Sequence, residues 1–203
     1  MTADKSWQLG APQTLSYQLF DALRKRLNRR LVRYLAAHAL QREGSCVLEA
    51  GAGPAFASSL LARADHVRLS VAVDLDREAL LEARRRDSVL PVVVADLYHL
   101  PFRRESFDLA WNSSTVEHLD ARNNALREMA RVTRRGGHVF VGVPYLVGPL
   151  GFQRWMARTP AGVWIGTVFS RAGLRAMLSE AGLHPDKPIL YFFRFFIGAL
   201  AEK

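Results

Sequence analysis

The sequence predicts an α/β fold in which a Rossmann-like, mostly parallel sheet carries helices on both faces. From residue 45 onward, short continuous apolar runs alternate with helix-compatible segments, and continuous apolar strands are typical of parallel sheets buried on both faces. The first of these runs ends in a glycine-rich turn at Gly51 and Gly53, directly before a helical segment. A strand, a tight turn and a helix N-terminus in this order bring backbone close to a ligand.

The elements follow in order along the chain. A loose arm is expected over residues 1–12 and one long helix over about 14–40. Strands are expected near 46–49, 68–74, 92–95, 107–112 and 138–143, and helices near 54–64, 77–87, 122–133 and 171–181. Gly136 and Gly137 predict a break ahead of the fifth strand, and Gly182 predicts the end of the last helix. The apolar tail over 188–203 is expected to add one or two strands.

Length and composition favour one cytoplasmic domain over residues 1–203. The chain has 203 residues, of which 49% are apolar, too many for a disordered chain. No apolar run reaches the roughly 18 residues of a membrane span, and the N-terminus lacks a secretory signal pattern. The single cysteine, Cys46, excludes an internal disulfide. Within this domain, residues 1–44 are expected to form an N-terminal arm and helix, and residues 145–168 interrupt the alternation as a candidate lid insertion. A patch that covers the sheet edge or forms a dimer contact is the alternative for this segment.

The net charge of +9 comes largely from arginine. Arg26, Arg29, Arg30 and Arg33 recur at helical spacing, with leucines on a roughly opposite face. A solvated helix face is the favoured interpretation. A weak contact with an anionic surface is the alternative, and no specific nucleic acid is expected as a partner.

Acidic residues close the first three strands and give the glycine turn its meaning. Glu49 ends the first apolar run, Asp74 ends the second and Asp96 follows the third. Parallel strands deliver these ends to one rim of the sheet, where open α/β folds bind ligands. The dinucleotide fingerprint needs a third glycine where this chain has Phe56, which disfavours a nicotinamide oxidoreductase.

The pattern E-x-G-x-G-x-A over 49–55 instead resembles the first motif of the class I S-adenosylmethionine-dependent methyltransferases. The likeness is greatest to their small-molecule branch, which includes ubiquinone and menaquinone methyltransferase-like proteins. It extends through residues 96–102, 106–119, 125–144 and 169–183. Ala55 stands where many members have a third glycine. The resemblance implies an antiparallel strand at the C-terminal edge of the sheet, S-adenosyl-L-methionine as cofactor and S-adenosyl-L-homocysteine as its product.

The resemblance also implies roles for individual residues. Asp74 would accept hydrogen bonds from the ribose hydroxyls, with Leu75 beside the adenine. Asp96 would bind the adenine amine, and Leu97 would pack against the ring or donate its backbone N–H. The methionine part would meet the turn and the strand ends, which contribute Glu49, Ala50, Gly51, Ala52, Gly53 and the backbone carbonyl of Asn112.

Catalysis and acceptor choice are less clearly marked. His118, after the fourth strand, is the candidate general base, although packing or shaping of the site is the alternative. The other histidines show no metal-ligand spacing. The segment 145–168 is aromatic, and Tyr145, Trp155 and Trp164 are candidate walls for the acceptor.

We therefore expect a methyltransferase acting on a small, apolar or aromatic acceptor, as a monomer or homodimer. A nucleic-acid methyltransferase is one alternative, although Asn112 is followed by Ser-Ser-Thr rather than by the Pro-Pro-aromatic motif of amino-group enzymes. A non-catalytic cofactor-binding protein with the same fold is the other. The sequence does not name the acceptor or its methylated atom.

Overall fold

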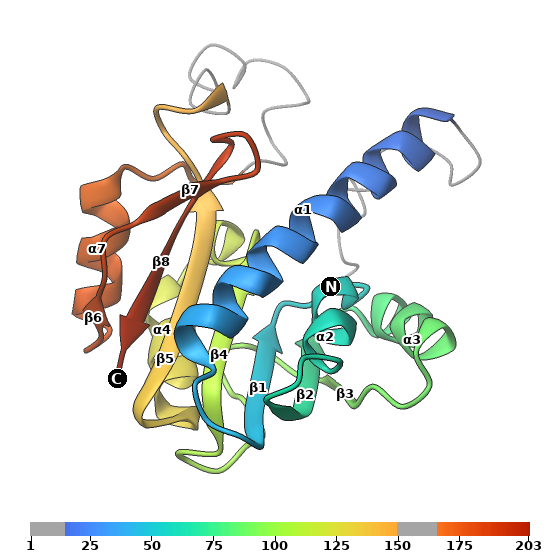
Figure 1. Ribbon diagram of the computed structural model, residues 1–203. Coiled ribbons are helices and arrows are strands. Elements are labelled where there is room, and N and C mark those ends of the chain that lie inside the picture. The colour runs from blue at the N-terminus through green and yellow to red at the C-terminus, as the bar shows by residue number, and fades with distance from the viewer. Residues whose placement is uncertain (1–14, 150–165) are drawn as a thin grey trace.

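The computed structural model describes residues 15–149 and 166–203 of the chain (Figure 1). Their strands form one sheet in the order β3-β2-β1-β4-β5-β8-β6, and β7 also pairs with β8. The strands are β1 (Ser45–Ala50), β2 (Val67–Asp74), β3 (Val92–Val94), β4 (Phe107–Ser113), β5 (Thr133–Pro144), β6 (His184–Pro185), β7 (Ile189–Tyr191) and β8 (Phe196–Glu202). The helices are α1 (Leu15–Ala39), α2 (Phe56–Leu61), α3 (Arg77–Arg86), the 3₁₀ turn η1 (Val116–His118), α4 (Arg122–Val132) and α7 (Arg171–Glu180).

The sheet is parallel from β3 to β5 and antiparallel at β8. This confirms the predicted fold class and the antiparallel strand at the C-terminal end of the sheet. The strand order reverses between β1 and β4, which are hydrogen-bonded neighbours. The glycine turn follows β1 and therefore lies at the topological switch point, where open α/β sheets bind their ligands.

The helices cover both faces of the sheet. In Figure 1, α1 crosses in front of the central strands and α4 lies behind them. Leu31 and Leu35 of α1 pack with Trp111 and Phe140 of the front face. On the other face, α4 and α7 pack against the alternate residues of the same strands, such as Leu48. Hydrophobic residues that point to opposite faces along one strand thus explain the two-sided core.

One local prediction is wrong. Gly136 and Gly137 do not precede the fifth strand, because β5 begins at Thr133. The pairing register shifts between Phe107 and Leu109 of β4, which pair with Thr133 and His138 of β5. The glycines therefore lie in a bulge within the strand, where Gly136 has a positive φ of 65°. Glycine often marks such bulges, and a bulge does not end a strand.

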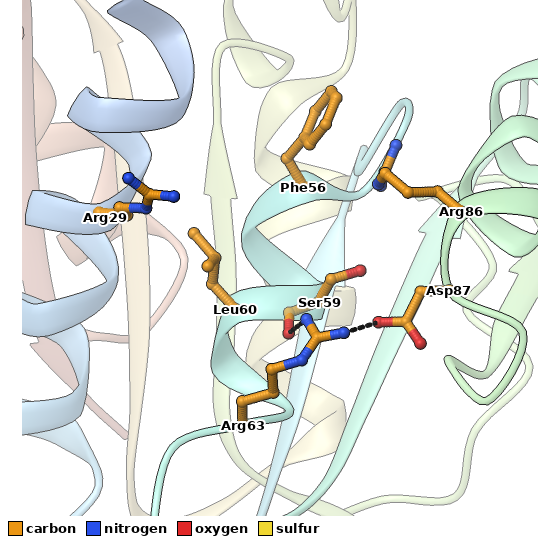
Figure 2. A pocket seen from close by; sticks show the side chains of 7 residues that line it. All are labelled: Arg29, Phe56, Ser59, Leu60, Arg63, Arg86 and Asp87. Atoms are coloured by element: carbon orange, nitrogen blue, oxygen red, sulfur yellow. Dashed lines mark hydrogen bonds and ion pairs between the residues drawn. The ribbon is translucent and has the colours of Figure 1, made fainter. Parts of the chain in front are cut away.

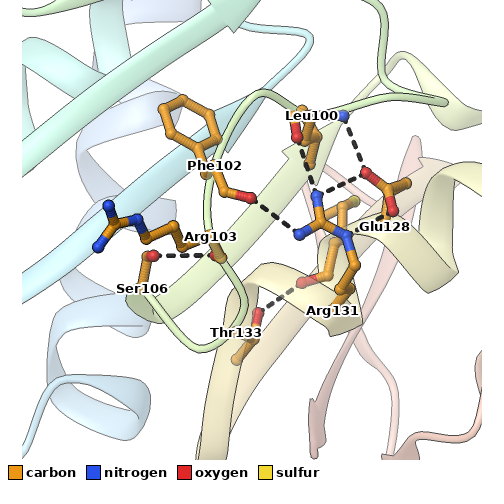
Figure 3. Close-up of polar contacts among 8 residues, drawn as sticks. Leu100, Phe102, Arg103, Ser106, Glu128, Arg131 and Thr133 are labelled. Carbon is orange, nitrogen blue, oxygen red and sulfur yellow. Dashed lines mark hydrogen bonds and ion pairs between the residues drawn. The ribbon is translucent and has the colours of Figure 1, made fainter.

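A polar cluster fixes the chain between β3 and β4 (Figure 3). The Arg131 guanidinium of α4 donates to the carbonyls of Phe102, at 2.8 Å, and Leu100, at 2.9 Å. It also pairs with Glu128, whose carboxylate accepts the Leu100 N–H at 2.9 Å. This cluster ties the chain between β3 and β4 to the C-terminal part of α4.

Candidate active site

The turn after β1 alternates left-handed residues. Gly51, Gly53 and Ala55 have φ values of 79°, 50° and 51°. A Cβ on Gly51 would lie 2.4 Å from the Thr115 hydroxyl oxygen, whereas a Cβ on Gly53 would meet nothing within 4 Å. The backbone N–H groups of Gly51 and Ala52 both donate to the Val73 carbonyl. Ala55 shares the left-handed conformation of the two glycines, and glycine adopts this conformation more easily than alanine does. The φ angle at position 55 therefore explains why a glycine would suit it.

Asp74 ties this turn to β2. One carboxylate oxygen accepts the Gly53 N–H at 2.6 Å, and the other accepts the Asp76 N–H at 2.8 Å. Asp76 is a different kind of acid, because its side chain caps α3 by accepting the N–H groups of Glu78 and Ala79. Asp76 is thus a helix cap, whereas the Asp74 carboxylate lies at the glycine turn. Leu75, between the two acids, is 71% exposed.

Glu49 lies under the turn. Its side chain is buried and accepts hydrogen bonds from the backbone N–H, at 2.9 Å, and the hydroxyl of Ser58 in α2. Burial raises the pKa of Glu49 to about 8, partly offset by the hydrogen bonds from Ser58 and reinforced by the nearby Asp74. The carboxyl group therefore anchors the first turn of α2 to the end of β1.

Asn112 joins the ends of β1 and β4. Its buried side chain donates to the Ala50 carbonyl and accepts the Val116 N–H at 3.2 Å. These two bonds commit both ends of the amide to the fold. The role expected at the cofactor belongs to its backbone carbonyl and stays a prediction.

The third rim acid lies in the open. Asp96 is exposed and accepts the Tyr98 N–H at 2.9 Å, as in a turn. Leu97 is only 7% exposed and packs in the core with Leu100. Little of its side chain is left for an adenine ring, so its backbone N–H is the better of its two expected contacts.

The segment after β4 contains a functional candidate that the sequence did not indicate. Glu117 is 3% exposed, and its Oε2 has no hydrogen-bond partner among the described residues. Burial raises the pKa of Glu117 to about 8, against the lowering effect of its own backbone N–H and of Arg122. A buried carboxyl oxygen without a partner is costly. In the sequence, nothing separates this glutamate from an exposed one.

His118 lies beside it on η1 and is exposed. Partial burial lowers the pKa of His118 below its usual 6.5, so its imidazole is neutral at pH 7 and can accept a proton. Gly166 approaches both residues, since a Cβ there would lie 2.9 Å from atoms of Glu117 and His118.

A second polar pair lies at the ends of β4 and β7. The hydroxyls of Ser113 and Tyr191 are 2.8 Å apart. Burial raises the pKa of Tyr191 above its usual 10, and Glu117 adds to this effect. Gly142 of β5 makes room for the phenol, because a Cβ at Gly142 would collide with the Tyr191 hydroxyl.

The two ends of the candidate lid lie side by side. Tyr145 forms a parallel bridge with Phe169, and Leu146 donates to the Phe169 carbonyl at 2.9 Å. Thr167 donates to the Glu117 carbonyl at 3.1 Å. The stretch 145–168 thus leaves and rejoins the fold beside η1. Tyr145 is buried, with 8% exposure, whereas Trp155 and Trp164 lie outside the described residues.

The residues at this rim are chemically suited to the expected cofactor. The rim presents the exposed Leu75 and Asp96, the Asp74 carboxylate and the open space around Gly53.

In the described ranges, no cluster of His, Cys, Asp and Glu is arranged to hold a metal ion. None of the described helices is both long and apolar enough to cross a membrane.

Comparison with known families indicates which class of protein this part of the chain resembles. Residues 48–141, which include the end of β1, all of β2 to β4 and most of β5, match the family model described as a methyltransferase domain. Over these residues the chain is similar to a methyltransferase domain. The resemblance to S-adenosylmethionine-dependent methyltransferases is confirmed, and the domain and fold imply S-adenosyl-L-methionine as the cofactor.

Two curated relatives illustrate the range of this domain. The chain is 38% identical to the malonyl-acyl-carrier-protein O-methyltransferase of Erwinia billingiae, over 52% of this chain and 41% of that protein. It is 29% identical to the 27-O-demethylrifamycin SV methyltransferase of Amycolatopsis mediterranei, over 77% of this chain and 60% of that protein. The chain thus spans about half the length of these relatives.

Solved structures share the fold at low identity. A chain from the complex between the Haloferax volcanii Trm112 methyltransferase activator and a methyltransferase has a TM-score of 0.73 at 18% identity, covering 92% of this chain and 96% of that one. The (4+2)-cyclase SpnF has a TM-score of 0.71 at 17% identity, covering 86% of this chain and 80% of that one. The fold therefore includes proteins named for methyl transfer and a protein named for another reaction.

Proposed function

We propose that this chain transfers the methyl group of S-adenosyl-L-methionine to a small, apolar or aromatic acceptor. The observation that carries the proposal is the position of Asp74, whose carboxylate receives the Gly53 N–H at the switch point of the sheet. In this proposal Asp74 binds the ribose and Asp96 the adenine amine. Gly51, Gly53 and the Asn112 carbonyl receive the methionine part.

The bound cofactor supplies an activated methyl group on a sulfonium, so the protein has mainly to orient the acceptor. Holding two reactants in line lowers a barrier by about 7–11 kcal/mol. His118, neutral at pH 7, is the proposed base for an acceptor that must lose a proton. The segment 145–168 is the proposed cover of the acceptor. Its C-terminal end contacts Glu117 through the Thr167 N–H, and Tyr145, Trp155 and Trp164 supply aromatic character.

The experiment is a calorimetric titration of S-adenosylmethionine and S-adenosylhomocysteine into the wild type, Asp74→Ala and Asp76→Ala. Losing hydrogen bonds to a charged group weakens binding by about 10- to 150-fold, so we expect this loss for Asp74→Ala. Asp76→Ala is the matched control, because it removes the neighbouring acid and lowers stability through the lost cap by about 1 kcal/mol. Equal affinity in all three proteins would refute the cofactor site.

The chemical class of acceptor is then found by mass spectrometry of metabolites that remain bound to the protein in the presence of S-adenosylhomocysteine. A retained small molecule that becomes heavier by one methylene unit on incubation with S-adenosylmethionine supports the proposal. A protein that binds the cofactor but methylates neither metabolites nor nucleic acid fits the alternative of a binding protein with this fold. Methylation of nucleic acid alone would establish the other alternative.

A further inference from the structure

A pocket lies beside α2 and is lined by residues that have no assigned role in methyl transfer. It has a volume of about 190 Å³ and lies between α1, α2 and the end of α3 (Figure 2). The described residues that line it are Arg29, Phe56, Ser59, Leu60, Arg63, Arg86 and Asp87. None of the residues assigned to the cofactor or acceptor is among them.

The lining is strongly basic. Three arginines, one from each helix or its end, face one aspartate, which leaves an excess of two positive charges. Arg63 donates to the Ser59 carbonyl at 2.7 Å and pairs with Asp87 at 3.1 Å. Arg86 donates to the Pro54 carbonyl and lies over the Phe56 ring, 3.8 Å from its centre. These contacts hold two guanidinium groups at the pocket before any ligand arrives.

Ser59 provides an independent sign of a ligand. The residue is 5% exposed, and its hydroxyl is buried without a hydrogen-bond partner in residues 15–149 and 166–203. The adjacent Ser58 differs, because its hydroxyl donates to Glu49. A buried hydroxyl normally finds a partner. An anion held by the arginines would supply the missing acceptor.

We propose that this pocket binds a phosphate group. Guanidinium groups present several N–H donors in a plane and suit phosphate oxygens, and a serine hydroxyl adds one more. The pocket is smaller than the roughly 300–1,000 Å³ of sites that enclose whole small molecules, which suits one anionic group of a ligand. Phe56 and Leu60 provide an apolar wall for the group that the phosphate is attached to. This site goes beyond the methyl-transfer site.

Calorimetry with inorganic phosphate as the probe tests the proposal, with sodium chloride at matched ionic strength as the reference. We expect saturable binding of one phosphate to the wild type. Removing one hydrogen bond to a charged group should weaken it by about tenfold in Ser59→Ala. Because the Ser59 hydroxyl has no partner among the described residues, this variant should not lower the melting temperature below that of the wild type.

Arg29→Gln and Arg26→Gln form a matched pair on α1. Both remove one exposed arginine from the same helix, one turn apart, but Arg26 is not among the lining residues. We expect Arg29→Gln to weaken phosphate binding more than Arg26→Gln, because only Arg29 of the two lines the pocket and can donate hydrogen bonds to the anion there. Equal weakening by both variants, or no saturable binding to the wild type, would overturn the proposal in favour of diffuse charge.

Vesicles of phosphatidylcholine with and without phosphatidylglycerol distinguish the two sources of the phosphate. A lipid head group in the pocket predicts that inorganic phosphate competes with the phosphatidylglycerol vesicles and that Ser59→Ala releases them. A soluble phosphorylated ligand predicts that Ser59→Ala loses phosphate binding while any vesicle binding is unchanged. Vesicle binding that falls equally in Arg26→Gln and Arg29→Gln, without phosphate binding, counts against the pocket.

Discussion

The two halves of the candidate site are built in different ways. On the cofactor side, Glu49, Asp74 and Asn112 all have their side chains bonded to the backbone of the turn, of α2 or of a neighbouring strand end. On the acceptor side, Glu117 keeps a buried carboxyl oxygen without a partner. In the first half these polar side chains all have hydrogen-bond partners, whereas the second half contains a carboxyl oxygen that has none among the described residues.

This difference separates two uses of polar groups. The proposed cofactor side uses carboxyl groups and an amide to fix backbone geometry, so that the surface proposed to receive the cofactor is already formed. The acceptor side maintains an unfavourable buried carboxyl next to Gly166 and Thr167, at the end of the candidate lid. Groups that cost stability tend to occur at functional sites.

The largest effect is expected from the glycine turn. Gly51→Ala puts a Cβ 2.4 Å from the Thr115 hydroxyl at a φ of 79°, whereas Gly53→Ala meets nothing within 4 Å. A left-handed alanine costs about 1–2 kcal/mol, and the clash at Gly51 adds to this. We expect Gly51→Ala to lower both the melting temperature and cofactor affinity more than Gly53→Ala, as measured by calorimetry. Equal losses would mean that the contact with Thr115 is unimportant.

The pH dependence of stability sharpens the comparison. Burial raises the pKa of both Glu49 and Glu117 to about 8, above the roughly 4.3 of an unfolded glutamate. The contribution of each group to the free energy of unfolding is therefore largest below about pH 4.3. As the pH rises it falls by at most about 1.4 kcal/mol per group and pH unit, until it is lost near pH 8. Urea unfolding at pH 6 and pH 9 measures it. Glu49→Gln should flatten the dependence, and an unchanged slope would count against a protonated Glu49.

A smaller but opposite pair of effects is expected at Glu117. Glu117→Leu removes the unsatisfied oxygen and should stabilise the fold by about 1–2 kcal/mol, as measured by urea unfolding. The same variant should lower kcat/KM for the identified acceptor by about tenfold if Glu117 hydrogen-bonds it, with unchanged cofactor affinity. Glu117→Gln should restore part of the activity. A leucine variant with wild-type kcat/KM would make Glu117 irrelevant to the acceptor.

The structure brings together the strand-end groups that the sequence proposed for the cofactor, whereas the sequence did not indicate the buried Glu117, and this difference has a physical reason. Strand-end acids and glycines are local features, and parallel strands bring them together whatever the rest of the chain does. Alternation likewise predicted the strands within a few residues, but not the bulge at Gly136, which depends on pairing with β4. The burial of Glu117 depends on the packing of the folded chain. The contact between Ser113 and Tyr191 joins residues that are far apart in the sequence. Neither feature can be predicted from the spacing of residues.

The smallest expected effect tests the one departure from the glycine pattern. Ala55 is fully buried and left-handed, with a φ of 51°. A left-handed conformation costs alanine about 1–2 kcal/mol, whereas glycine adopts it freely but loses about 0.4–1 kcal/mol through the greater entropy of the unfolded chain. Ala55→Gly should therefore stabilise the protein by about 0.5–1 kcal/mol, measured as a shift of the urea midpoint at constant m-value. Because Ala55 follows the turn and has no expected cofactor contact, cofactor affinity should stay within about twofold in calorimetry, a free-energy change of about 0.4 kcal/mol. A loss of stability would show that the alanine methyl contributes more through packing than it costs in backbone strain.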